Sequence, residues 1–425
     1  MAEIRPFRGI RYNQARHSDL SSVISPPYDV ISPAQYRRLR DLSPQNVVRL
    51  ILGENYGSGR SGGETYEDSR ALLDRWLDDQ ILVQDTQPAI YLLDQTFEID
   101  RRRHTRRALI ARLRLEVFGE GSVFPHEQTM PGPKADRLAL MNKTRMNMSQ
   151  VFGLYPGSEQ ATATLDEMSE VEPVAEGTGT DGVHNTLRVL FDQDLIGDLA
   201  ASLSDRQVII ADGHHRYETA IAYRDAMRRQ AGERVEDAPW EFVAVALVSM
   251  DDPGLVIQPT HRLVHEVPNF APTDLFERAN ENFQIEEHPA DADIIIDRLE
   301  QLVDRHVFGI VTAQGTRIMV RNAGQRGATG RPEDLDTHIL HHEIFGGLLG
   351  MGPDSWQKGG PIEYVQSAED CVKAASSGQA RLAALVNPTR MDEVRAIAVA
   401  GGTMPPKSTF FAPKFPAGIV FNPLT

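Results

Sequence analysis

Five polar or flexible residues follow a short aliphatic run near the middle of the chain. The segment IIADGHHRYETA, residues 209–220, contains in direct succession Asp212, Gly213, His214, His215 and Arg216. Glycine lets the backbone turn sharply or approach a ligand, and an arginine fork can hold a phosphate at two points. Histidine adds hydrogen-bond donors, or a general acid or base. Together these residue types indicate a site for an anion, most simply a phosphate.

The surrounding pattern places these residues between a strand and a helix. Residues 208–210 are continuously apolar, as in a central strand that is buried on both faces. From about Arg216 to Arg229, apolar side chains recur at offsets of three and four, which predicts a helix. The first amides of a helix have no partner within the helix and carry partial positive charge. A phosphate at this corner would therefore meet backbone amides as well as Arg216.

Two other interpretations of the corner stay open at this point. Asp212 could cap the helix while His215 packs beneath it, with no ligand involved. A metal site is the third interpretation, although adjacent histidine side chains diverge and rarely chelate one ion together.

A second group of charged residues lies in a loop broken by proline and glycine. The segment VFPHEQTMPGPKADR, residues 123–137, contains His126, Glu127, Lys134 and Arg137. Loops that carry charges of both signs beside glycine often line ligand sites. A solvated loop is the alternative.

The C-terminal segment is rich in lysine, proline and aromatic residues. In GGTMPPKSTFFAPKFPAGIVF, residues 401–421, Lys407 and Ser408 follow two prolines, and Lys414 lies between a proline and a phenylalanine. Rigid turns that carry lysine beside aromatic rings suit a pocket for an anionic or aromatic ligand. A proline-rich edge strand is the alternative.

Histidines also cluster in THILHHE, residues 337–343. On a helix, His338 lies over His341 and His342 at offsets of three and four, a spacing that could chelate a divalent ion. The order of a zinc-protease HExxH motif is missing, and a helix with a histidine-rich polar face is the alternative.

Composition limits the class of protein. The chain has 425 residues with 44 Lys and Arg against 60 Asp and Glu, a formal net charge of −16 that argues against non-specific nucleic-acid binding. A single cysteine, Cys371, excludes an intramolecular disulfide and a cysteine-rich zinc site. The N-terminus lacks the apolar region of a signal peptide, and no run of about 18 apolar residues predicts a membrane span. These features predict a cytoplasmic protein without a membrane partner.

The order of predicted elements indicates an α+β (mixed α/β) protein with mixed sheets. Residues 89–99 and 106–118 read as a hairpin, and residues 241–250 as a further buried strand. Ser32 with Pro33 marks a helix start. Three segments are expected, with boundaries near 1–155, 156–270 and 271–425.

Six motifs give the chain a family resemblance. SPPYDVI, PHEQT, KADRLALM, ADGHHRYETA, PTHRL and MPPKSTFFAPKFPAGIV occur in this order. They resemble the bacterial and archaeal proteins grouped as domain-of-unknown-function family 1015, from about residue 4 to residue 421.

The DGHHR element also resembles the Asp-Gly-x-His-Arg corner of the ParB/sulfiredoxin-like superfamily, which includes free serine kinases that use ADP or ATP. The resemblance implies a ParB/sulfiredoxin-like core in which Gly213, His215 and Arg216 cradle a nucleotide phosphate. It also implies that Asp212 lies near the transferred group or its Mg²⁺. Sulfiredoxins carry a reactive cysteine where this chain has His214, so sulfinate reduction is not expected.

We therefore expect a nucleotide-dependent phosphotransferase that uses ATP or ADP, with serine as the model for a small hydroxylated acceptor. Asp29 or Glu127 would take the hydroxyl proton. Asp212, His214 and His215 complete the catalytic set. The expected phosphate and nucleotide contacts are Gly213, Arg216, His126, Lys134, Arg137, Lys407, Ser408 and Lys414. Two alternatives remain: a ParB-like nucleotide-binding regulatory module, and a metal-dependent phosphohydrolase that uses the histidines.

Overall fold

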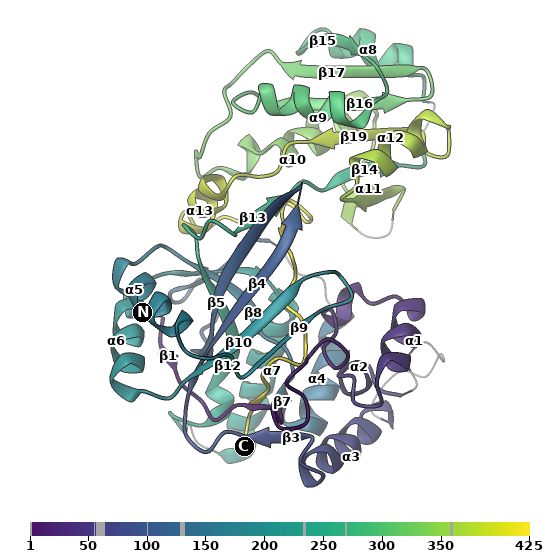
Figure 1. The fold of residues 1–425 in the computed structure, drawn as a ribbon. Helices are drawn as coiled ribbons and strands as arrows, with labels where there is room; N and C mark the ends of the chain where they lie inside the picture. Colours follow the sequence, from purple (N-terminus) through teal and green to yellow (C-terminus); the bar gives the residue numbers. More distant parts are fainter. Residues whose placement is uncertain are drawn as a thin grey trace. The chain divides into compact units, whose positions relative to one another are not determined.

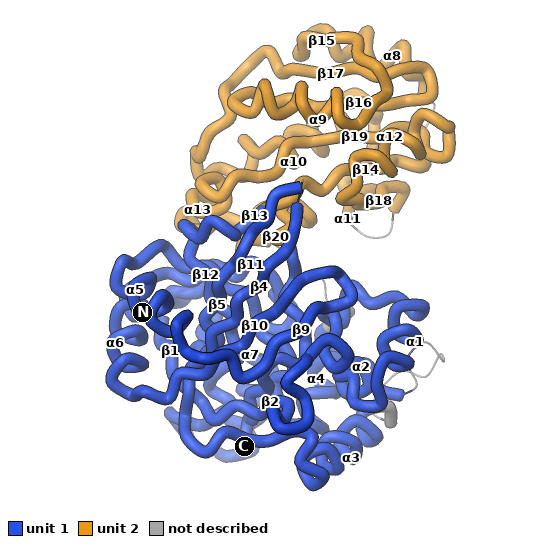
Figure 2. Tube along the Cα trace, in the orientation of Figure 1, with its two compact units in different colours: residues 1–125, 129–256, 413–425 blue, residues 126–128, 257–412 orange. Residues whose placement is uncertain are grey.

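The chain divides into two compact units, which Figure 2 shows in different colours. The computed structural model describes residues 2–54, 56, 64–99, 101–127, 132–232, 235–267, 270–357 and 360–425. Unit 1 comprises residues 1–125, 129–256 and 413–425, and unit 2 comprises residues 126–128 and 257–412.

The main sheet of unit 1 is mixed (Figure 1). Its strands follow the order β6-β11-β8-β12-β5-β4-β10-β9, with β1 paired to β5. The pairs β6–β11 and β8–β12 are parallel, and the other pairs are antiparallel. The strands are β1 (Ile4–Arg5), β4 (Ile90–Ile99), β5 (Arg102–Arg114), β6 (Val123–Pro125), β8 (Val151–Tyr155), β9 (Ala175–Thr178), β10 (His184–Leu190), β11 (Val208–Asp212) and β12 (Phe242–Ser249).

Helices pack against this sheet and against one another. Figure 1 shows α5 and α6 side by side next to the sheet, and α4 packs on both α3 and α7. The helices are α1 (Pro33–Leu42), α2 (Val48–Ile51), α3 (Glu64–Asp78), α4 (Gly132–Thr144), α5 (Glu159–Ser169), α6 (Gln193–Ser204) and α7 (His214–Ala231), with 3-10 turns at η1 (Tyr28–Val30) and η2 (Pro239–Glu241). Shorter strand pairs join β2 (Ile10–Tyr12) to β3 (Leu82–Gln84), and β7 (Met146–Asn147) to β21 (Asn422–Pro423).

Several local predictions are confirmed in unit 1. The expected hairpin is formed by β4 and β5, and the expected buried strand is β12. Ser32 caps α1 through a hydrogen bond from the Gln35 amide, and the Gln35 side chain accepts from the Ser32 amide. The mixed sheet confirms the predicted α+β class.

The division into two units differs from the three segments expected from the sequence. Strand β8 ends at Tyr155 and pairs with β11 and β12, so a boundary at residue 155 would cut the main sheet. The C-terminal residues 413–425 return to unit 1 because their strand β21 pairs with β7.

Unit 2 contains an antiparallel sheet in the order β15-β17-β16-β19-β14-β18. Alternate residues of β16 join two separate apolar clusters, one on each face of this sheet. The strands are β13 (Val256–Gln258), β14 (His261–Val264), β15 (Phe283–His288), β16 (Val307–Thr312), β17 (Gly315–Arg321), β18 (Ile362–Val365), β19 (Leu382–Val386) and β20 (Phe410–Ala412). The helices are α8 (Pro272–Ala279), α9 (Ala292–Gln301), η3 (Pro332–Asp334), α10 (Asp336–Ile339), the π-helix η4 (Leu340–Leu348), α11 (Asp354–Gln357), α12 (Ala368–Ser376) and α13 (Met391–Val399).

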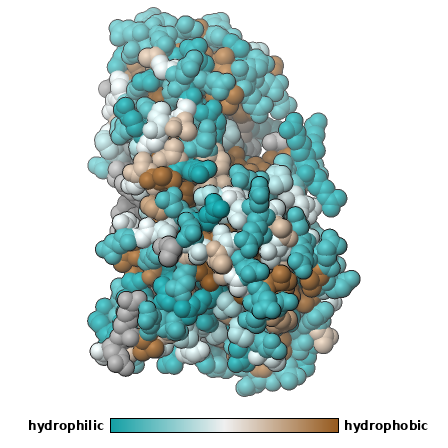
Figure 3. Space-filling model, turned by 90° about the vertical axis from the view of Figure 1, so that its left-hand side faces the viewer, coloured by the Kyte–Doolittle hydropathy of each residue, from teal (hydrophilic) through white to brown (hydrophobic). Residues whose placement is uncertain are grey.

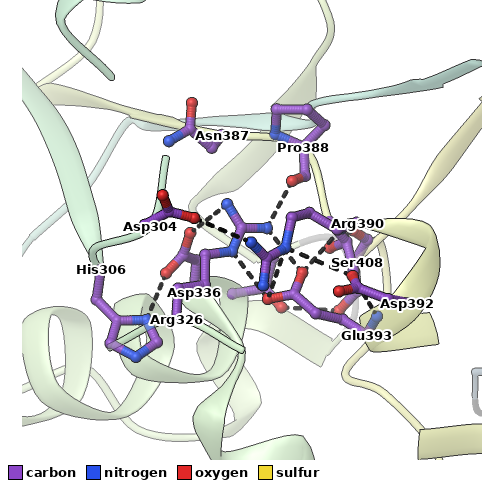
Figure 4. A network of polar contacts seen from close by, with 12 residues as sticks. Asp304, His306, Arg326, Asp336, Asn387, Pro388, Arg390, Asp392, Glu393 and Ser408 are labelled. Atoms are coloured by element: carbon purple, nitrogen blue, oxygen red, sulfur yellow. Dashed lines mark hydrogen bonds and ion pairs between the residues drawn. The ribbon is translucent and has the colours of Figure 1, made fainter. Parts of the chain in front are cut away.

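A buried polar network stabilises one end of unit 2 (Figure 4). Arg326 pairs with Glu393 at 2.8 Å and with Asp336 at 3.2 Å, and all three side chains are at most 3% exposed. His306 Nδ1 lies 2.8 Å from Asp336 Oδ1. The Arg326 guanidinium also donates to the Pro388 carbonyl, so one arginine ties the segment before η3 to the start of α13.

The face seen in Figure 3 is largely hydrophilic, with hydrophobic residues gathered only in small patches. Among the described residues, no helix is long and apolar enough to cross a membrane.

Candidate functional site

The predicted strand–glycine–helix corner is present in unit 1. Strand β11 ends at Asp212, α7 begins at His214, and Gly213 between them has φ +85°. A Cβ at Gly213 would lie 2.8 Å from the Arg216 Nε atom. Glycine is therefore required here both by the left-handed backbone and by the close approach of the arginine.

Asp212 is shared by two cationic side chains. Arg216 Nη2 donates to Asp212 Oδ2 at 2.5 Å, and Lys414 Nζ donates to Asp212 Oδ1 at 2.5 Å. Burial by itself would raise the pKa of Asp212, but Lys414 and Arg216 together lower it well below that of an ordinary aspartate. Asp212 is therefore an anion at neutral pH, and its two oxygens are shared by two cationic side chains.

Arg216 is also held from its other side. Its side chain is 10% exposed, and Nη1 donates to the Gln150 carbonyl, which precedes β8. The guanidinium that was expected to meet a phosphate thus contacts Asp212 and a backbone oxygen in this conformation.

A buried arginine that the sequence prediction missed fixes the segment carrying Lys414. Arg106 on β5 is 0% exposed and donates to the Pro413 carbonyl at 2.6 Å. Its guanidinium lies 4.5 Å from the ring centre of Phe415 and 4.9 Å from that of Phe152. Burial lowers the pKa of Arg106 to about 9, so it is still charged at neutral pH. No local signal separated this arginine from the charged hairpin turn that precedes it.

A small cavity of about 50 Å³ lies beside Arg216, lined by Tyr28, Arg137 and Thr219 among others. The Arg137 guanidinium lies 4.2 Å from the centre of the Tyr28 ring. Burial and Asp29 raise the pKa of Tyr28, whereas Arg216 and Arg137 act to lower it. Among the described residues, the buried Thr219 hydroxyl has no hydrogen-bond partner. Tyr28 and Thr219 were not predicted, although Tyr28 belongs to the SPPYDVI motif.

Three other predicted residues lie in unit 1 with the corner. Arg137 is 7% exposed and donates to Asp136, to the Ile51 carbonyl and to the Tyr66 hydroxyl. Lys134 at the start of α4 pairs with Glu218 of α7 at 2.6 Å. Asp29 is exposed within η1, directly after the Tyr28 that lines the cavity.

The remaining predicted residues, His126, Glu127, Lys407 and Ser408, belong to unit 2. His126 Nε2 lies 2.8 Å from Thr409 Oγ1, and Glu127 Oε2 accepts from the Lys407 amide at 3.3 Å. The Ser408 hydroxyl donates to the Pro405 carbonyl at 2.7 Å and lies 2.9 Å from Thr337 Oγ1. Ser408 therefore connects the Pro405 carbonyl to Thr337 of α10, and Figure 4 shows it within the drawn network.

The geometry does not fit the expected Mg²⁺ on Asp212. Both Asp212 oxygens already accept from cationic donors, and the residues that the structure describes contain no group of three His, Cys, Asp or Glu placed to hold a metal ion.

The histidine cluster of unit 2 is arranged by ring stacking. The rings of His338 and His342 stack with centroids 4.0 Å apart, while His341 is 1% exposed and stacks on Trp356 at 5.4 Å. Burial lowers the pKa of His341 well below its usual value. The chelating arrangement considered for this helix is therefore wrong for the described conformation.

Comparison with known proteins identifies the family. Residues 4–338 match the family described as "Protein of unknown function (DUF1015)", and the chain belongs to that family. No relative was found among the curated proteins. Among solved structures, a mutant of free serine kinase in complex with AMP is 12% identical and covers 70% of this chain and 88% of that one, with a TM-score of 0.34. A conserved hypothetical protein from Pyrococcus furiosus is 13% identical (70% and 91% covered, TM-score 0.32). C-terminally truncated SbnI from Staphylococcus aureus is 10% identical (70% and 82% covered, TM-score 0.33).

Proposed function

We propose that the chain is a nucleotide-dependent phosphotransferase whose corner at Asp212–Arg216 holds the phosphates of ATP or ADP. The observation that carries this proposal is the sharing of one carboxylate by two cations, Arg216 and Lys414, at the first turn of α7. The partial positive charge of a helix N-terminus adds to the charge of these two side chains. An anion is the ligand class that such a site binds.

Binding requires Arg216 to exchange partners. A cavity of about 50 Å³ holds only a few water molecules, whereas ligand pockets typically measure about 300–1,000 Å³. The nucleotide phosphate would replace Asp212 as the partner of the Arg216 guanidinium. Asp212 would keep its ion pair with Lys414. Gly213 gives the backbone the freedom for this local rearrangement.

The transfer itself needs a proton acceptor beside the acceptor hydroxyl. The oxygen of a small hydroxylated metabolite, with serine as the model, would form a bond to the terminal phosphorus. The bond from that phosphorus to the bridging oxygen would break, and ADP or AMP would leave. Asp29 is the carboxylate of unit 1 that we assign to the hydroxyl proton, because it adjoins Tyr28 at the cavity. Arg137 and Arg216 would neutralise the charge that develops on the phosphoryl oxygens.

Titration calorimetry of ADP against single arginine variants tests the proposal. We expect Arg216→Ala to weaken ADP binding at least 10-fold, because a charge-assisted fork to phosphate is lost. Arg229→Ala, an exposed arginine near the other end of the same helix, is the matched control and should bind like the wild type. Equal affinity of Arg216→Ala and wild type would overturn the phosphate site.

Turnover distinguishes the transferase from a regulatory module. With ATP and serine, we expect phosphoserine to accumulate and Asp29→Asn to lower its rate at least 10-fold. Glu127→Gln in unit 2 serves as the comparison for Asp29→Asn. Tight nucleotide binding without transfer to any hydroxylated acceptor would favour a nucleotide-binding regulatory module instead.

A further inference from the structure

A second and larger cavity lies in unit 1 at the ends of two parallel strands. Strands β8 and β12 run parallel and end at Tyr155 and Ser249, and helix α5 begins shortly after at Glu159. The cavity beside these strand ends measures about 750 Å³, which is within the usual range for a small-molecule pocket. None of its lining residues belongs to the corner at Asp212–Arg216.

The charge of this cavity is negative. Its lining contains the carboxylates of Glu159, Asp166, Asp251 and Asp252. Among the described residues that line it, Arg107 is the only lysine or arginine, and this side chain pairs with Asp94 at 3.0 Å and with Asp166 at 2.7 Å. A positively charged ligand is therefore favoured over an anion.

A buried hydroxyl in the wall of the cavity lacks a partner. Tyr155 is 1% exposed, and among the described residues its hydroxyl makes no hydrogen bond. Burial, followed by the charges of Asp252 and Asp251, raises the pKa of Tyr155 to about 12, so the hydroxyl is neutral at physiological pH. Tyr155 and both aspartates line the same cavity. A buried hydroxyl without a partner costs free energy that a ligand could recover.

The two aspartates differ in how they are held. Asp252 accepts from the Arg107 amide at 3.1 Å and from the Gly254 amide at 2.7 Å, so its carboxylate is fixed by the backbone. Asp251 is exposed, and a Cβ added to Gly157 would lie only 1.9 Å from its Oδ2 atom. The absence of a side chain at Gly157 thus lets Asp251 lie close against the loop that leads into α5.

We propose that this cavity binds a small organic cation with a primary ammonium group on an aliphatic stem, of the diamine or polyamine class. The ammonium would donate to Asp251 and to the Tyr155 hydroxyl, and the stem would lie along Ala163, Leu165 and Pro253. An organic cation is favoured over a metal ion, because the described residues include no group of three carboxylates or histidines placed to hold one. The proposal is independent of the nucleotide site.

Calorimetric titration of the whole protein with spermidine tests this site. We expect saturable binding that weakens at least 5-fold in Asp251→Asn and at least 3-fold in Tyr155→Phe. Asp198→Asn, an exposed aspartate of α6 outside the cavity, should bind spermidine like the wild type. Tyr155→Phe also separates the proposal from a merely structural role, because a hydroxyl that met no ligand would leave the affinity unchanged.

Four results would overturn the proposal. The first is that spermidine gives no saturable heat, and the second is that both cavity variants bind it with unchanged affinity. The third is that Asp198→Asn weakens spermidine binding as much as the cavity variants do. The fourth is that Mg²⁺ at equal concentration displaces spermidine. The ADP titration of the same preparations is read separately, so failure of the cation site leaves the result at Arg216 unaffected.

Discussion

Two of the charged clusters, one in each unit, share their charges in opposite ways. At the start of α7, one carboxylate, Asp212, is shared by the two cations Arg216 and Lys414, and these side chains are 10–17% exposed. In unit 2, one cation, Arg326, is shared by the two carboxylates Asp336 and Glu393, and these side chains are only 1–3% exposed.

The difference separates a candidate ligand site from a structural network. Where two cations share one carboxylate beside a cavity, one of them can exchange that carboxylate for an anion, as we propose for Arg216. Arg326 already pairs with two carboxylates and is buried, so an exchange of partners would separate a buried carboxylate from its arginine. We therefore propose that the way the charges are shared, and whether a ligand can reach them, distinguish a binding cluster from a structural one.

The largest expected effect is on the structural side of this comparison. Arg326→Met should lower the free energy of unfolding by about 3–5 kcal/mol, because it removes the arginine that two buried carboxylates share. Urea unfolding measures this loss. Arg331→Met, at an arginine that is 69% exposed with partners at 3.9 Å, is the control and should change stability by less than about 1 kcal/mol. If both variants lowered the free energy of unfolding equally, the Arg326 cluster would not be the structural network that the comparison requires.

A smaller effect on stability is expected when the pH is lowered and Asp212 becomes protonated. Lys414 and Arg216 lower the pKa of Asp212 below its unfolded value of about 3.9, so the stabilisation is complete above that pH and is lost as the pH falls towards the lowered value. With about 2–3 kcal/mol at stake for hydrogen bonds to charged groups, wild type should lose more stability than Asp212→Asn between pH 5 and the acid limit of folding. Chemical denaturation at a series of pH values measures the two slopes. Parallel curves for the two proteins would show that Asp212 is not held by these cations.

The corner itself could be predicted because its signals are local. The apolar run of β11, Gly213 and the periodicity of α7 lie within 24 consecutive residues and specify strand, turn and helix in order. The long-range partners could not be predicted in the same way. Lys414 was predicted as a phosphate contact, but its ion pair with Asp212 spans 202 positions. Nothing local in the sequence shows which residues meet at that separation.

Burial was the other property that the sequence did not reveal. Arg106 lies in a run of arginines typical of a solvated hairpin, yet Phe152 and Phe415 enclose it. The SPPYDVI motif drew attention to Asp29, whereas Tyr28 is the residue that lines the cavity. In both cases the packing of distant segments decides which polar side chain becomes part of a site.

The most direct test of the phosphate site is a crystal structure of the protein with ADP bound. We predict a phosphate at the first turn of α7, held by the Arg216 guanidinium, with Asp212 still paired to Lys414. A nucleotide bound elsewhere, or an Arg216 that stays on Asp212 while ADP is bound, would contradict the proposal.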